Sequence, residues 1–166
     1  MDHYTLSVLV ENHAGVLSKV AGLFSRRGFN IDSLAVGTTQ DETVSRITIE
    51  VTGDAQTVEQ ISKQLGKLID VIKIKTLRAD VLVKRCLVLV KVKCTSKTRT
   101  DILEIANVFR AKVVDLSPNT VTIEITGPVT KIDAFIDLIR PFGIEEIART
   151  GVTALERGAN TLKLDK

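Results

Sequence analysis

Hydrophobic residues recur with two different periods along the chain, and these periods divide its first half into six predicted elements. Leu6, Val8 and Val10 stand at every second position and share one face of a strand. An apolar stripe at helical spacing follows and ends near Gly28, a residue suited to the left-handed position after a helix. In chain order, the pattern predicts a strand over residues 5–10, a helix from Leu17, strands over 31–38 and 44–51, a helix after Asp54, and a strand around 72–75.

The same order of elements recurs in the second half. The pattern predicts a strand over residues 86–94, a helix over 102–109, a hairpin of 112–117 and 120–126, a helix over 132–139 that Pro141 stops, and a strand over 144–149. Each half is therefore an α+β unit of the ferredoxin-like βαββαβ plan, with an antiparallel sheet and both helices on one face. The chain is two such units in tandem.

The predicted domains are residues 1–77 and 85–166, joined by a linker at 78–84. Residues 151–166 show no clear period, so we expect them to be a loosely held tail.

Composition indicates a globular protein of the cytoplasm. Hydrophobic residues make up 44% of the 166 positions and charged residues 26%. No apolar run approaches the roughly 20 residues that span a bilayer, and the N-terminus lacks a signal segment, so no membrane partner is expected. Cys86 and Cys94 would lie about 26 Å apart in one strand, at about 3.3 Å per residue, which excludes a bridge between them within the strand and indicates buried thiols.

The sequence offers no catalytic machinery and no metal site. His3 and His13 are the two histidines, they stand ten residues apart, and no phosphate-binding or metal-binding motif accompanies them. A nucleic-acid partner is not expected either, because the net charge is only +3 and the two central strands of each unit lack the aromatic residues on which RNA bases stack.

The junction between the first strand and the first helix, residues 11–18, is the candidate binding site. Free amides at a helix N-terminus, together with the helix dipole, attract an anion such as a carboxylate. Gly15 allows close approach to the main chain, and Asn12 offers a donor and an acceptor beside it. By themselves these two residues could equally be a helix cap and a packing requirement.

Several motifs resemble one known family. Glu-Asn-x-x-Gly-x-Leu over residues 11–17, in a βαββαβ unit, is similar to the ACT domain, a small-molecule sensing module. Other segments resemble the regulatory (small) subunit of acetolactate synthase: Ser7-Val8-Leu9-Val10-Glu11-Asn12, Gly22-Leu23-Phe24-Ser25, Arg27-Gly28-Phe29-Asn30-Ile31, Ser45-Arg46, Asp133-Ala134-Phe135 and Ala148-Arg149-Thr150-Gly151.

This resemblance implies a catalytic (large) subunit as partner, and the cofactors thiamin diphosphate, Mg and FAD are expected on that subunit, with none on this chain. It implies activation of that subunit and feedback inhibition by valine, leucine or isoleucine. The implied effector site lies between two chains of a homodimer, with Asn12, Gly15, Val16, Leu17 and Ser18 from one chain and Asn30 and Ile31 from the other. Without the resemblance, Asn30 is equally a turn residue and Ile31 an ordinary core residue.

The second unit departs from the motif. Its corresponding turn, residues 94–98, has neither the asparagine nor the glycine, so we expect no amino-acid site there and a function in dimerisation or in docking the catalytic subunit. Two alternatives stay open at this point: an ACT-type sensor for a different pathway enzyme, and a free-standing enzyme on the same plan.

Overall fold

The computed structural model describes residues 2–164, which form two compact units. The first unit comprises residues up to Val83 together with those from Gly151 onward, and the second comprises Lys84–Thr150. Among the described residues, no helix is long and apolar enough to cross a membrane.

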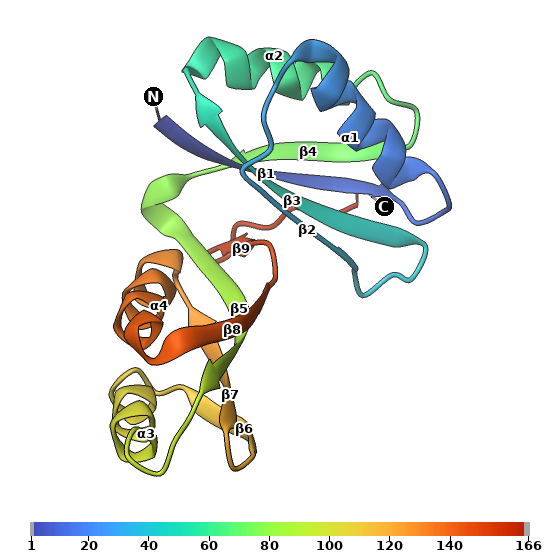
Figure 1. The fold of residues 1–166 in the computed structure, drawn as a ribbon. Coiled ribbons are helices and arrows are strands. Elements are labelled where there is room, and N and C mark those ends of the chain that lie inside the picture. The colour runs from blue at the N-terminus through green and yellow to red at the C-terminus, as the bar shows by residue number, and fades with distance from the viewer. Residues whose placement is uncertain (1, 165–166) are drawn as a thin grey trace. The chain divides into compact units, whose positions relative to one another are not determined.

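The first unit is a four-stranded antiparallel sheet with both helices on one face (Figure 1). Its elements are β1 (Asp2–Glu11), α1 (Val16–Arg27), β2 (Ser33–Thr38), β3 (Val44–Gly53), α2 (Ala55–Leu65) and β4 (Val71–Leu77). The strand order is β2-β3-β1-β4, so β2 and β4 are the two edges. This is the βαββαβ plan that the sequence predicts.

The core of this unit lies between the sheet and the helices. Leu6 and Val8 of β1 are fully buried against the apolar stripes of α1 and α2, as the alternation in the sequence predicts. Gly28 ends α1 in the left-handed conformation, with φ 69°. Asp54 caps α2 by accepting a 2.7 Å hydrogen bond from the amide of Thr57.

The second strand is shorter than predicted, because it begins at Ser33 rather than at residue 31. Ile31 packs against the helix-side core and so belongs to the connection after α1. Asn30 donates its side-chain amide to Oδ1 of Asp32 at 2.8 Å, which closes a local turn before the strand begins.

The second unit repeats the plan, as predicted, with strand order β6-β7-β5-β8. A 3-10 turn, η1 (Ala79–Val81), precedes it, and its elements are β5 (Leu82–Lys93), α3 (Arg99–Val108), β6 (Lys112–Leu116), β7 (Thr120–Gly127), α4 (Val129–Gly143) and β8 (Ile144–Arg149). Cys86 and Cys94 are buried free thiols, as the sequence predicts. The expectation that Pro141 stops the last helix is wrong: α4 continues to Gly143, because a proline so near the end of a helix removes only one late hydrogen bond.

The segment after Gly151 is not loosely held. It carries a further strand, β9 (Thr153–Glu156), which pairs with β5, and by its contacts it groups with the first compact unit. Val152 and Ala154 are each only 3% exposed, and the amide of Val152 donates to Oγ of Ser33 at 2.8 Å. This C-terminal segment covers the face of the sheet opposite the helices (Figure 1), where the outward-facing Ser7 is fully buried.

Glu156 anchors the C-terminal segment through a buried ion pair. Its side chain is 2% exposed and accepts hydrogen bonds from Nζ of Lys75 at 2.6 Å and from the amide of Arg78 at 3.2 Å. The hydrogen bond from Lys75, then that from Arg78, lowers the pKa of Glu156 below its ordinary value. A carboxylate with a lowered pKa stabilises the fold above its unfolded-state pKa, and this stability is lost as the pH falls through the folded-state pKa.

We therefore expect the Glu156→Gln variant to be less stable than the wild type near pH 7 and to lose stability less steeply on acidification. Urea unfolding between pH 3 and pH 7 measures both effects. Glu59→Gln is the matched control, because Glu59 also pairs with a lysine, Lys63, but with its side chain 64% exposed. Equal effects of the two substitutions would contradict an anchoring function for Glu156.

Candidate functional site

The junction between β1 and α1 has an uncapped helix N-terminus. Gly15 is the residue before the helix and adopts the left-handed conformation, with φ 88° and ψ −12°. No side chain caps the helix there. The interpretation of Asn12 as a plain helix cap is therefore wrong, and Gly15 is required by its backbone angles.

The amides at this junction are available to a ligand. The amide of Val16 makes only a long 3.5 Å contact with the carbonyl of His13. Within residues 2–164, no hydrogen-bond acceptor is recorded for the amides of Gly15, Leu17 and Ser18. Unpaired N–H groups at the positive end of a helix dipole suit a carboxylate or another small anion.

Asn12 is fixed beside these amides by the turn between β2 and β3. Its backbone amide donates to the carbonyl of Thr43, and its Nδ2 donates to the carbonyl of Glu42, each at 2.8 Å. Because the carbonyl of Glu42 can only accept, the side-chain amide is oriented, and Oδ1 remains as an acceptor for an ammonium group.

The three helix residues of the predicted site differ in exposure. Val16 is 3% exposed and belongs to the core, so it can offer a ligand only its backbone. Leu17 is 43% exposed, and Ser18 is also exposed. Apolar contact with a ligand at this junction would therefore come from Leu17.

Asn30 and Ile31 lie at the other end of α1, after Gly28. Because α1 has 12 residues, it separates them from Gly15 by about 18 Å at about 1.5 Å per residue. A single chain thus brings together residues 12–18 but not residues 30 and 31. The predicted combination of the two groups requires a second copy of the chain.

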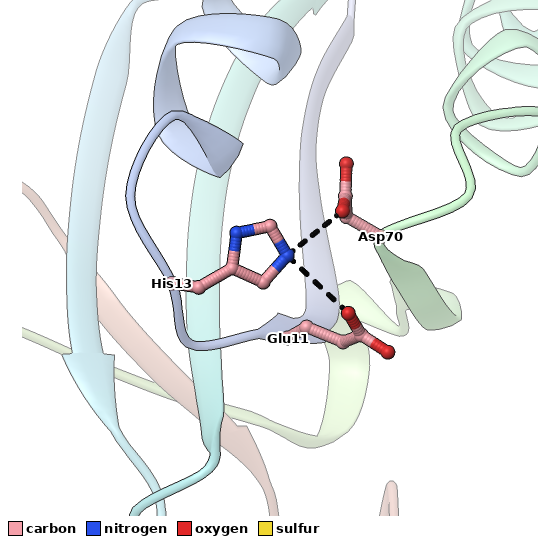
Figure 2. A group of neighbouring side chains, drawn as sticks. All are labelled: Glu11, His13 and Asp70. Carbon is pink, nitrogen blue, oxygen red and sulfur yellow. Dashed lines mark ion pairs between the residues drawn. The ribbon is translucent and has the colours of Figure 1, made fainter.

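A polar cluster that the sequence interpretation did not include adjoins this junction (Figure 2). Nε2 of His13 lies 2.9 Å from Oδ1 of Asp70 and 3.3 Å from Oε2 of Glu11, and Nζ of Lys19 lies 2.7 Å from Oδ2 of Asp70. The Asp70 side chain is only 7% exposed. Sequence alone could not show this cluster, because 57 positions separate His13 from Asp70 along the chain.

The cluster shifts the pKa values of its members. The hydrogen bond to the Ala14 carbonyl, then the negative charge of Asp70, raises the pKa of His13. The hydrogen bond from Lys19, reinforced by the charges of Lys19 and His13, lowers the pKa of Asp70.

The corresponding junction of the second unit has two threonines whose hydroxyls bond to each other's backbone. The amide of Thr95 donates to Oγ1 of Thr98 at 3.0 Å, and the amide of Thr98 donates back to Oγ1 of Thr95 at 3.3 Å. These bonds lie before α3, and α3 itself, like α1, begins without a side-chain cap. The second unit lacks the asparagine and the glycine of the first junction, and the absence of an equivalent site there stays a prediction.

A cavity of about 310 Å³ lies under the C-terminal segment of the first unit. Arg46 borders it and donates to Oγ of Ser7 at 2.6 Å and to the carbonyl of Leu162 at 3.4 Å. The cavity is on the sheet face away from the helices, so it is separate from the junction at Gly15.

Comparison with known protein families matches both units. Residues 6–73 match the ACT domain of the small-subunit type of acetohydroxyacid synthase, and residues 85–158 match the small subunit of acetolactate synthase. The chain belongs to the acetolactate synthase small-subunit family. The small subunit is the regulatory, non-catalytic component of that enzyme. The two matches also favour this family over an ACT-type sensor for another pathway.

Individual relatives agree over nearly the whole length. The probable acetolactate synthase small subunit of Methanothermobacter thermautotrophicus is 50% identical over 97% of this chain and 96% of its own. The acetolactate synthase small subunit of Mycolicibacterium smegmatis is 52% identical over 93% of this chain and 91% of its own. The crystal structure of the acetolactate synthase small subunit from Thermotoga maritima superimposes with a TM-score of 0.91 at 41% identity, covering 96% of this chain and all of that one.

Proposed function

We propose that this chain activates the thiamin-diphosphate-dependent catalytic subunit of acetolactate synthase and confers feedback inhibition by a branched-chain amino acid. The observation that carries the proposal is the uncapped start of α1, where Gly15 adopts a left-handed conformation beside an oriented Asn12. An amino acid presents a carboxylate, an ammonium group and a side chain, and this junction offers a complementary partner for each.

In the proposed complex, the effector carboxylate accepts hydrogen bonds from the amides of Gly15, Leu17 and Ser18. Its ammonium group donates to Oδ1 of Asn12, and also to the partner's Asn30. The aliphatic side chain contacts Leu17 and the partner's Ile31. Burial of a valine-sized side chain against these residues is worth about 1.5–3 kcal/mol, so the effector is an aliphatic amino acid. Valine, leucine and isoleucine differ by one methylene or by branching alone, so the proposed effector is any one of these three.

The proposed homodimer forms through β2. One side of β2 is paired with β3 and the other side is a sheet edge. Pairing of two such edges about a two-fold axis would give a continuous eight-stranded sheet. Because each site would then contain residues of both chains, effector binding would favour one dimer geometry. A coupling of typically 1–3 kcal/mol could pass this preference to the catalytic subunit. The second unit supplies further contacts, either within the dimer or with the catalytic subunit. The location of the protein in the cytoplasm stays a prediction.

Reconstitution with the catalytic subunit tests the proposal. Acetolactate formation from pyruvate is measured for the catalytic subunit alone, with this chain, and with this chain plus valine, leucine or isoleucine. We expect the chain to raise the rate and at least one of the three amino acids to reverse that increase. A catalytic subunit whose rate is the same with and without this chain would overturn the proposal.

A further inference from the structure

Glu11, His13 and Asp70 bring one ring nitrogen and two carboxylate groups within 4.8 Å of one another. The Nδ1 atom of His13 lies 3.1 Å from the carbonyl oxygen of Ala14. Since a carbonyl oxygen only accepts, Nδ1 must carry the hydrogen and donate it. In the neutral imidazole, Nε2 then has no hydrogen and presents a lone pair.

That lone pair is directed at two carboxylates. Nε2 lies 2.9 Å from Oδ1 of Asp70 and 3.3 Å from Oε2 of Glu11 (Figure 2). Three electron-rich atoms this close repel one another unless a positive charge lies among them. Lys19 already brings one positive charge to Oδ2 of Asp70, and the charge beside Nε2 itself is either a second proton on His13 or a metal ion.

The surroundings match those of a metal-binding histidine. Such a histidine usually donates its other ring N–H to a backbone carbonyl or carboxylate, which fixes the ring and its tautomer. Ala14 supplies that carbonyl here. The ligand atoms of the three residues all lie within 4.8 Å of one another, and tetrahedral coordination at about 2.0–2.1 Å requires ligand separations of about 3.3 Å.

The contact of Lys19 with one oxygen of Asp70 orients the other oxygen as a possible metal ligand. Lys19 holds Oδ2 at 2.7 Å, so Oδ1 alone is left toward His13. Glu11 is 58% exposed, which leaves its side chain room to adjust and leaves water access to the remaining coordination positions. With His13 neutral, the charges of Glu11, Asp70 and Lys19 sum to −1, which favours a divalent cation.

We propose that Glu11, His13 and Asp70 form a binding site for a divalent transition-metal ion of the zinc type. One nitrogen and two carboxylate oxygens are ligands that Zn²⁺ accepts, with water completing the shell. The ion would join the loop after β1 to the residue that precedes β4. It would thereby hold the loop that carries Asn12 and Gly15 in one conformation.

Metal titration of the full chain without an affinity tag tests the site. Co²⁺ binding is followed by its visible absorption, and Zn²⁺ binding by calorimetry, with no amino acid present. We expect one ion per chain and at least a tenfold weaker affinity in the His13→Gln and Glu11→Gln variants. Loss of even an outer-shell partner costs 10–100-fold in metal affinity.

His3→Gln is the matched control, because His3 is the chain's other histidine and lies in β1 of the same unit. It should bind the metal as the wild type does. The metal site would be overturned if the wild type bound no metal or if His13→Gln left the metal affinity unchanged. It would also be overturned if nitrogen NMR at pH 7 showed a doubly protonated His13 ring in Zn²⁺-treated protein. Because no amino acid is used, failure here leaves the proposed effector site untouched.

Discussion

The Gly15→Asp variant is expected to lose affinity for the branched-chain effector by at least roughly 100-fold while it keeps its fold and its ability to activate the catalytic subunit. The substitution sets a carboxylate beside the amides that would bind the effector carboxylate. Like charges juxtaposed in an interface cost several kcal/mol, and each loss of about 1.4 kcal/mol lowers the affinity tenfold. A Cβ at Gly15 meets no atom within 4 Å, so no neighbour is displaced. Calorimetry with valine, leucine and isoleucine measures the loss.

Two control variants separate charge from backbone strain. Gly15→Asn has nearly the same size and tolerates the left-handed conformation, but it carries no charge. We expect it to weaken binding much less than Gly15→Asp. Gly158→Asp introduces the same charge at another exposed glycine with positive φ, 74°, and should leave effector affinity unchanged. Wild-type affinity in Gly15→Asp would show that the ligand carboxylate is bound elsewhere.

A mixed dimer can show that the site is shared between chains. Gly15→Asp damages the loop half of the site, and Asn30→Ala damages the half supplied by the partner. In a dimer of one Gly15→Asp chain and one Asn30→Ala chain, one site carries both defects and the other is intact. Each pure variant should bind poorly, whereas the mixed dimer should regain one binding site per dimer. No recovery on mixing would contradict a site built across two chains.

The Val36→Asp variant is expected to dissociate the homodimer and, as a consequence, to lose effector binding. Val36 lies on β2, the sheet edge proposed to pair across the two-fold axis, and it is 46% exposed. In a symmetric pairing the substitution introduces a carboxylate from each chain into the interface, and charges on an edge strand oppose strand pairing. We expect at least a tenfold weaker dimer, measured by analytical ultracentrifugation over a dilution series.

Ile72→Asp is the matched control for this prediction. Ile72 lies on β4, the opposite edge of the same sheet, and it is 42% exposed. The variant introduces the same charge at a similar degree of exposure, so a general effect of charge on the sheet would appear in both proteins. If Val36→Asp stayed dimeric with normal effector affinity, pairing through β2 would be wrong.

Much of the fold follows from local patterns in the sequence. Alternation placed Leu6 and Val8 on the helix-side face of β1. Gly28 and Asp54 mark the end of α1 and the start of α2, because their backbone preferences are local. The motif at residues 11–18 likewise identified the junction whose amides are free. These features depend on neighbours within a few residues, which is the range over which hydrophobic period and turn chemistry act.

The sequence predictions failed where contacts between residues far apart in the chain decide the structure. Residues 151–164 have no period, yet Val152 and Ala154 are buried, and the amide of Val152 bonds to Ser33, a residue far earlier in the chain. Likewise, the pattern did not show that α1 turns the side chain of Val16 into the core, which leaves only its backbone for a ligand.

The sequence by itself determined two βαββαβ units and a glycine-containing helix start suited to an anion. Only the tertiary structure decided that Asp70 meets His13, that Glu156 anchors the C-terminal segment to β4, and that Asn30 lies a helix length away from Gly15. The physical reason is the range of the interactions. Backbone preferences and hydrophobic period are properties of adjacent residues, whereas ion pairs and composite sites depend on where the folded chain brings remote residues together.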